Sequence, residues 1–236
     1  MICRPPYTPC MSMLKNAALT GLVMGAVAVV VIFLANPFEG GTPNPTGSFA
    51  PVAPLLENPD PAFTVGRGIG AIDAPVVLEV WADFQCPICG QWANNIEPRL
   101  YERYVVDGKL RIEHHHYAFL GEESFTSAIG AVCAEKQDKY WAFSSWVYAN
   151  QHGENEGGFS DERLRIIAAA AGLDLAAYDA CITDPANRAE VEADAAAAAT
   201  LGVNSTPTLK IGDWMEPGLP TVDAISAKID AALGKK

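Results

Sequence analysis

Apolar and polar residues form long blocks along the chain, and each block predicts a structural element. Residues 76–81 are apolar except for one glutamate, which is typical of a strand buried on both faces. Residues 109–119 also have the composition of a strand. Between the two we expect a helix over residues 86–105, bent by Pro98 in its interior. A strand, helix, strand order with one crossover predicts a right-handed parallel pair.

The second half of the chain has mainly helical patterns. Helices are predicted over residues 124–150, 161–172, 175–183 and 186–201. A short strand is expected over residues 208–211, and an amphipathic helix over residues 222–233. The predicted fold is therefore one α/β domain over residues 64–236, whose small mixed sheet is interrupted by a helical insertion at about residues 122–185.

The first 63 residues have a different character. Residues 16–35 carry no charge, and as a helix they would span roughly 30 Å, about one bilayer core. We interpret them as a membrane anchor. A cleaved signal peptide is the alternative, but its apolar region is usually about 7 to 15 residues long and ends in a small-residue site that Phe33-Leu34-Ala35 matches poorly. Residues 36–63 contain seven prolines and three glycines, a composition typical of an extended tether.

Charge supports a topology and excludes some partners. Arg4 and Lys15 precede the anchor and Glu39 follows it, so the positive-inside rule places residues 1–15 in the cytoplasm and the globular domain outside the cell membrane. The chain has a net charge of -12 and no basic run, which argues against nucleic acid or an anionic membrane surface as its partner.

The sequence Cys86-Pro87-Ile88-Cys89 lies where the first predicted strand ends and a helix begins. The first N–H groups of a helix lack internal partners, and with the helix dipole they stabilise a thiolate at Cys86. Pro87 suits the first helical turn because its missing N–H costs nothing there. Cys89 comes round beside Cys86 one turn later. Spacing and context therefore predict redox chemistry at this pair.

Several further motifs follow in a defined order along the chain. They are Asp83-Phe84-Gln85 before the dithiol, Phe119-Leu120-Gly121 followed by Ser124, Ala131-Val132-Cys133-Ala134 with Gln137, Tyr140-Trp141, Gly172-Leu173-Asp174, and Gly202-Val203 with Thr206-Pro207-Thr208. In this order they resemble DsbA-like thiol:disulfide oxidoreductases of the thioredoxin superfamily. The resemblance covers about residues 64 to 234 and implies a thioredoxin fold with an inserted helical subdomain.

The resemblance assigns roles beyond the dithiol. It implies that Pro207 is cis and packs beside the cysteine pair, although local sequence alone favours trans, since only about 5 to 6% of such bonds are cis in folded proteins. Thr206 would offer its backbone to an extended substrate and tune the redox potential. Relatives often join the positions of Cys133 and Cys181 in a disulfide; two buried free thiols are the alternative. No cofactor is implied.

Two positions depart from the pattern of the family. Ile88 stands where the strongest oxidants have a histidine, which predicts a less stabilised Cys86 thiolate and a weaker oxidant. Val80 stands where many relatives carry a buried acid that transfers protons. Glu79 is one residue away and should point to the opposite face of the strand, so it is not expected to replace that acid.

The resemblance implies an enzyme that exchanges disulfides with extracytoplasmic proteins. Cys86 would form the mixed disulfide, Cys89 would resolve it, and a membrane quinone-linked protein would reoxidise the pair of a monomeric enzyme. A disulfide reductase or isomerase is the alternative within this class. A metal-delivery module using Cys86 and Cys89 with a histidine is a second alternative. The sequence His114-His115-His116 does not favour it, because alternate strand residues face opposite ways and the three cannot converge.

Overall fold

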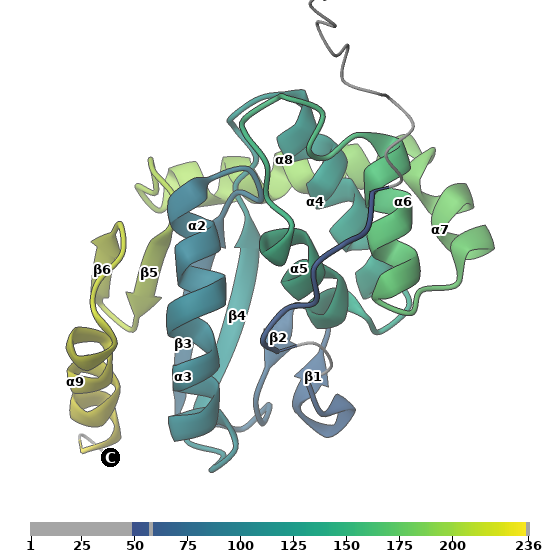
Figure 1. The fold of residues 1–236 in the computed structure, drawn as a ribbon. Helices are drawn as coiled ribbons and strands as arrows, with labels where there is room; N and C mark the ends of the chain where they lie inside the picture. Colours follow the sequence, from purple (N-terminus) through teal and green to yellow (C-terminus); the bar gives the residue numbers. More distant parts are fainter. Residues whose placement is uncertain (1–48, 57–58, 235–236) are drawn as a thin grey trace, which may run out of the picture. The chain divides into compact units, whose positions relative to one another are not determined.

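A six-stranded mixed sheet forms the centre of the protein (Figure 1). The computed structural model describes residues 49–56 and 59–234. The strand order is β1-β2-β4-β3-β5-β6, and β3 (Val76–Ala82) runs parallel to β4 (Leu110–His116), as predicted. The other neighbouring pairs are antiparallel and involve short strands: β1 (Thr64–Val65), β2 (Gly68–Ile69), β5 (Thr208–Ile211) and β6 (Trp214–Pro217). β5 matches its prediction, whereas β1, β2 and β6 were not predicted; β1 and β2 have only two residues each.

The predicted cytoplasmic segment at residues 1–15, the anchor at residues 16–35 and the tether as far as residue 48 lie outside the described residues. Among the residues that the structure describes, there is no helix of sufficient length and apolarity to cross a membrane.

The helix that follows the dithiol runs along one face of the sheet. It consists of α2 (Pro87–Gln91), η2 (Trp92–Ile96), α3 (Glu97–Leu100) and η3 (Tyr101–Val105), and the two η segments are π-helical turns. The predicted helix is thus confirmed, and its hydrogen-bond register changes just before Pro98, which has no N–H to donate. α9 (Val222–Leu233) matches its prediction and contacts α3, β3 and β5.

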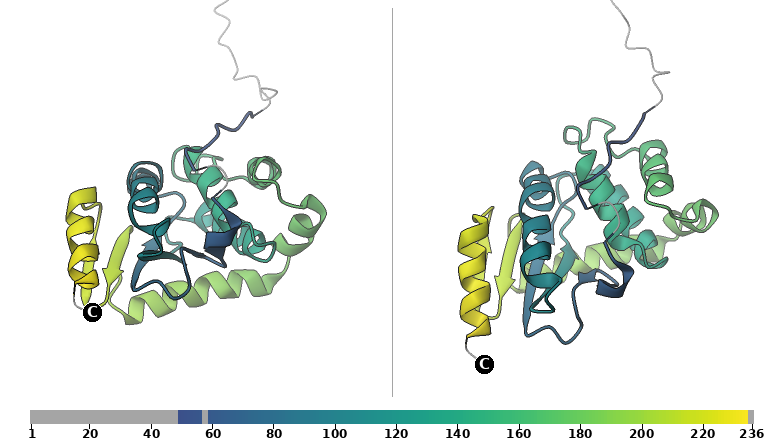
Figure 2. Two further views of the ribbon diagram at one scale, coloured as in Figure 1. Left: turned by 90° about the horizontal axis from the view of Figure 1, so that it is seen from below. Right: turned by 60° about the horizontal axis from the view of Figure 1, so that its bottom comes forward.

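The other face of the sheet is covered in part by α8 (Pro185–Thr200), which Figure 2 shows passing beneath the strands. Trp81 of β3 packs with Ala198 and Val203 on this face, whereas Val80 points into the main core. The prediction of a strand buried on both faces therefore holds at the end of β3 nearest the dithiol. It fails near its start, because Val77 is 40% exposed.

A helical region is inserted between β4 and α8, as predicted. It contains α4 (Glu122–Glu135), α5 (Tyr140–Ala149), α6 (Asp161–Ala170) and α7 (Leu175–Ile182). The prediction of one helical segment over residues 124–150 is wrong, because the chain turns between α4 and α5. Asp138 has a left-handed backbone (φ 56°), and the N–H of Lys139 donates to Ala134 O (2.8 Å), which closes the turn and ends α4.

Residues 49–56, called the strap below, pack on this helical region, although the sequence predicts a tether there. The N–H of Val52 donates to Asn150 Oδ1 (2.7 Å), and Asn150 Nδ2 donates to Val52 O (2.8 Å). The guanidinium of Arg163 lies 3.6 Å from the centre of the Phe49 ring. The compact unit accordingly begins at Phe49. Proline content predicts an extended backbone, but it does not exclude that this backbone is held by apolar and polar contacts.

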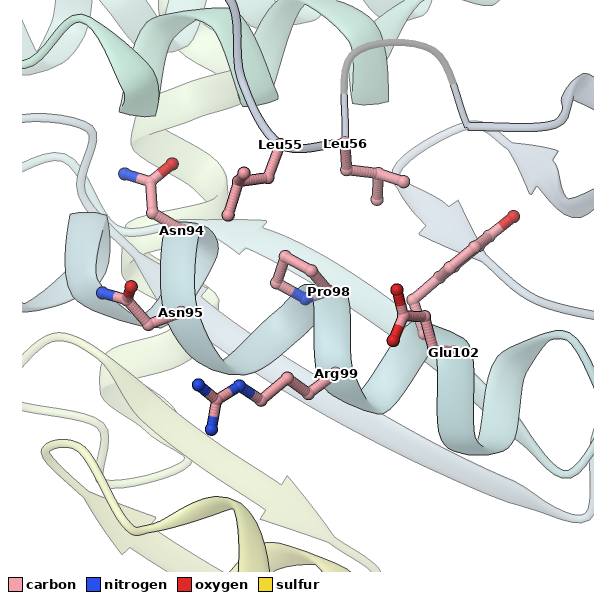
Figure 3. Close-up of a pocket in the computed structure, with 8 residues that line it drawn as sticks. Leu55, Leu56, Asn94, Asn95, Pro98, Arg99 and Glu102 are labelled. Atoms are coloured by element: carbon pink, nitrogen blue, oxygen red, sulfur yellow. The ribbon is translucent and has the colours of Figure 1, made fainter.

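The strap also lies against the helix that follows the dithiol (Figure 3). Leu55 and Leu56 face Asn94 and Pro98 across a cavity of about 360 Å³. Its other lining residues are Asn95, Arg99, Tyr101 and Glu102. The strap therefore connects two parts of the molecule, the inserted helical region and the helix that begins at the dithiol.

Cys133 of α4 and Cys181 of α7 are joined by a disulfide, with a sequence separation of 48. Asn187 of α8 donates from Nδ2 to Cys181 O (2.7 Å), so the bridge is also tied to the helix that crosses the sheet. The disulfide thus fixes the inserted region internally and holds it near α8.

Replacing Cys133 and Cys181 together by alanine is expected to lower the free energy of unfolding by roughly 4 kcal/mol, because a closed loop of this length restricts the unfolded chain. Urea unfolding of the oxidised protein measures the change. The double variant Cys3→Ala/Cys10→Ala is the control and should unfold like the parent. Equal midpoints for all three proteins would contradict the prediction.

Candidate active site

The two cysteines of the dithiol lie at the junction of β3 and α2. After β3 ends at Ala82, a short turn brings Cys86 to the N-cap of α2, with Pro87 in the first helical turn. The N–H of Cys86 donates to Asp83 O (3.1 Å), and the N–H of Gly90 donates to Cys86 O (3.1 Å). Cys86 and Cys89 are free thiols, 7% and 0% exposed. Only the first sulfur is thus within reach of the surface.

Cys86 lies where a thiolate is stabilised. Hydrogen bonding with the Cys89 thiol is the largest effect, and Thr206 and the backbone N–H groups of Cys89 and Ile88 add to it. Together they lower the pKa of Cys86 to about 6, against the opposing effect of burial. The helix terminus therefore acts as the sequence analysis expects, although the neighbouring thiol contributes more.

Cys89 has the opposite character. Burial in the core raises its pKa well above the ordinary thiol value, and the adjacent Cys86 raises it further. At neutral pH the pair therefore consists of one thiolate near the surface and one protonated thiol beneath it. This asymmetry suits thiol-disulfide exchange, because Cys86 is both the better nucleophile at neutral pH and the better leaving group.

The loop between α8 and β5 completes the site. The Thr206–Pro207 peptide bond is cis, and Cys86 Sγ lies 3.5 Å from Thr206 O. The Thr206 Oγ1 atom is buried, and the Thr206 side chain lowers the pKa of both thiols. The structure thus brings together Cys86, Cys89, Thr206 and Pro207 from segments more than 100 residues apart.

Ile88 lies at the edge of the site with its side chain 41% exposed, and its backbone N–H, not its side chain, acts on Cys86. This agrees with the expectation that position 88 supplies no positive charge to the thiolate. Phe119, which follows β4, is 50% exposed, and its N–H is held by Asp83 in the turn before the dithiol. Ile88 thus presents apolar surface within the dithiol motif, and Phe119 presents it on the loop that Asp83 holds to the turn before the dithiol.

Asp83 organises the turn that carries Cys86. Its carboxylate is 1% exposed and accepts four hydrogen bonds. Oδ1 accepts from the N–H of Gln85 (2.8 Å) and from Ser124 Oγ (2.8 Å), and Oδ2 accepts from the N–H groups of Phe119 (2.9 Å) and Leu120 (3.2 Å). One buried carboxylate thus joins the turn before the dithiol to the loop after β4 and to the first turn of α4.

Glu79 lies on the opposite face of β3 from the dithiol, as the alternation of strand residues predicts. Its carboxylate pairs with Lys210, and its Oε1 lies 3.6 Å from His115 Nε2. His115 is the larger influence and Lys210 adds to it, so the pKa of Glu79 is lowered to about 2. Glu79 is therefore ionised at neutral pH, and it lies on the face of β3 opposite the buried side chain of Val80.

A buried carboxylate comes instead from a different element. Glu97 of α3 has its Oε2 2.7 Å from His114 Nε2 and accepts from Trp92 Nε1 (3.0 Å). His114 is the parallel-strand partner of Val80, so this pair lies in the core below the helix that carries the dithiol. The sequence offered no signal for it, because Glu97 lies on a helix and His114 on a strand.

The three consecutive histidines do not converge. His114 and His116 are buried in the core, whereas His115 lies on the other face and stacks on Trp81 with ring centres 4.9 Å apart. Within the described part of the chain, no group of three or more histidine, cysteine, aspartate or glutamate side chains is arranged to hold a metal ion.

The sheet, the inserted helices and the Cys-Pro-Ile-Cys pair beside a cis-proline define a thioredoxin-fold protein. Comparison with known families agrees: the family described as Thioredoxin matches residues 64–231. The chain belongs to this family.

Individual relatives are distant in sequence but similar over most of their length. The probable disulfide bond formation protein D of Bacillus cereus is 27% identical over 178 residues, covering 74% of this chain and 82% of that protein. The structure of oxidised BdbD from Bacillus subtilis has a TM-score of 0.67 at 20% identity and covers 79% of this chain and 100% of that one. The structure of α-DsbA1 of Wolbachia pipientis has a TM-score of 0.64 at 25% identity, and the match covers 72% of this chain and 91% of that one.

The reactivity of Cys86 is expected to follow a single titration near pH 6. A group whose pKa is lowered is deprotonated above that value, so alkylation of the reduced protein should accelerate as pH rises through about 6 and then level off. Iodoacetamide kinetics, with mass spectrometry to identify the Cys86 peptide, measure this profile. Cys89 should remain unmodified over the same range, and alkylation that continues to rise to pH 9 would contradict the assignment.

Asp83→Asn is expected to destabilise the protein by about 1–3 kcal/mol, because an amide cannot accept from four donors and part of the buried network is left unpaired. Urea unfolding of the oxidised protein measures this change. Asp73→Asn, at an exposed position, is the matched control and should unfold like the parent. A similar loss in both variants would mean that the four hydrogen bonds do not contribute specifically.

Proposed function

We propose that the chain introduces disulfide bonds into extracytoplasmic proteins. The observation that carries this proposal is the unequal environment of the two thiols, with a lowered pKa at Cys86 and a raised pKa at Cys89. Because this environment favours the reduced pair, it makes the oxidised pair a better acceptor of electrons. The chain is a protein-disulfide oxidoreductase, and relatives named for disulfide bond formation support oxidation as its direction.

The reaction begins with the Cys86–Cys89 disulfide. A substrate thiolate attacks Cys86 Sγ, so that a mixed disulfide forms and Cys89 leaves and takes up a proton, as its raised pKa favours. A second thiolate of the substrate then attacks the substrate sulfur of the mixed disulfide. Cys86 leaves as a thiolate, and the substrate has lost two electrons and two protons to form its disulfide.

Substrate binding is proposed at the surface around Cys86. The backbone of Thr206 would pair with an extended polypeptide beside the cis-proline, and Ile88 and Phe119 supply exposed apolar surface for its side chains. An extended, unfolded chain with reduced cysteines fits such a surface better than a folded protein. Thr206, Pro87, Ile88 and Pro207 thus support the pair Cys86 and Cys89 in this scheme.

The location and the reoxidising partner are part of the proposal. The Cys133–Cys181 disulfide suits an oxidising compartment, and the uncharged residues 16–35 would anchor a monomer whose N-terminus lies in the cytoplasm. A membrane quinone-linked protein would then accept the two electrons that the reduced dithiol has collected. The surface around Cys86 that binds the substrate would also bind this partner.

The direction of exchange is tested with the full chain in two assays. We expect the oxidised protein to accelerate disulfide formation in a reduced, unfolded substrate protein and to be less effective in reducing insulin with dithiothreitol. Cys86→Ser should abolish both activities, since the attacked sulfur is lost, whereas Cys3→Ser/Cys10→Ser should retain them. Faster insulin reduction, or repair of a scrambled substrate without net oxidation, would support the reductase or isomerase. Stoichiometric metal binding without either activity would overturn the proposal.

A further inference from the structure

Gln151 reaches the turn that carries Cys86 from the inserted helical region. It lies two residues after the end of α5. Its Nε2 donates to two backbone carbonyl oxygens, Phe84 O (2.7 Å) and Cys86 O (2.9 Å). These carbonyls belong to the peptide groups just before Gln85 and just after Cys86. A single side-chain amide thus bridges the turn on both sides of the nucleophile.

The other end of the same amide is packed against α2. A Cβ atom added to Gly90 would lie 1.9 Å from Gln151 Oε1, so a larger residue at this position would require the Gln151 amide to move. Gly90 has an ordinary helical backbone, so this contact concerns space rather than conformation. The two hydrogen bonds of Nε2 fix its direction, and the absence of a side chain at Gly90 leaves room for Oε1.

Gln151 is also held at its own backbone position. The preceding residue, Asn150, is paired with Val52 of the strap through two hydrogen bonds and donates to Trp146 O (2.7 Å). Four residues after Gln151, the N–H of Asn155 donates to Gln85 Oε1 (2.6 Å). The segment that carries Gln151 is therefore hydrogen-bonded to the strap before it and to the turn that carries Cys86 after it.

We propose, on the basis of the function proposed above, that Gln151 is a positioning residue, which holds Cys86 Sγ at the start of α2 by bridging the carbonyl oxygens of Phe84 and Cys86. Cys86 has an extended backbone (φ -66°, ψ 119°), and this geometry directs its sulfur toward the N–H groups that begin the helix. Without the bridge each peptide group keeps one hydrogen bond, from the Gln85 N–H to Asp83 Oδ1 and from the Gly90 N–H to Cys86 O, but the link between the two groups is lost and the sulfur is held less firmly.

Burial shifts the pKa of two further side chains in the core near the thiols away from neutral pH. Tyr148 of α5 is buried, which raises its pKa well above the ordinary value, and burial lowers the pKa of His116 of β4 well below its ordinary value. The carboxylate of Asp83 is fully hydrogen-bonded. His152 is exposed and adjacent to Gln151, so the experiment is repeated with His152→Asn, which removes the imidazole.

The test compares Gln151→Met and Gln151→Glu with the parent as reduced, full-length proteins. Iodoacetamide rates at the Cys86 peptide are measured against pH by mass spectrometry. We expect the midpoint to rise by about half a pH unit in both variants, which corresponds to roughly threefold less thiolate below the midpoint. Gln151→Glu should show the larger rise, because it places a carboxylate against two carbonyl oxygens.

Asn94→Leu is the matched control. Asn94 of η2 donates from Nδ2 to Tyr148 O of α5 (3.1 Å). This is also a bond from a side-chain amide to a backbone carbonyl, but it does not involve the turn that carries Cys86. Its midpoint should equal that of the parent even if its stability falls. Midpoints for both Gln151 variants within error of this control would overturn the proposal. Alkylation needs no substrate protein, so failure here is distinguishable from failure of the proposed function.

Discussion

Chemistry in this protein depends on keeping two sulfurs of the same helical turn in different surroundings. Cys86 stands at the start of α2, where backbone N–H groups face outward and favour its anion. Cys89 is placed in the core by the helical periodicity, where burial favours its protonated form. Both environments follow from where β3 ends, because that point decides which cysteine is the N-cap and which is one turn inside.

A junction between a strand and a helix does not hold such an arrangement by itself. The turn is fixed by side chains from distant segments, with the Asp83 carboxylate binding the loop after β4 and the start of α4, and Gln151 binding from the end of α5. The inserted helical region thus supports the dithiol directly, in addition to covering the sheet. The strap extends this support, because it is paired with the residue next to Gln151.

The two departures from the family pattern have different structural consequences. At position 88 the change affects only the side chain, because the backbone N–H of Ile88 still acts on Cys86. At position 80 the loss of an acid is accompanied by a buried carboxylate from another direction, since Glu97 meets His114, the strand partner of Val80. A buried, hydrogen-bonded Glu97–His114 pair thus lies below the dithiol helix.

The sequence by itself determined the elements whose cause is local. The apolar run of β3, the dithiol at a helix start, the helix over residues 86–105 and the opposite facing of Glu79 and Val80 all follow from periodicity and from the properties of helix ends. The order of motifs also indicated the thioredoxin fold and its insertion. Tertiary structure alone decided the packing of the strap and the contacts of Glu97 and Gln151. These depend on residues up to 98 positions apart, and no short-range pattern records which distant backbone group a side chain will reach.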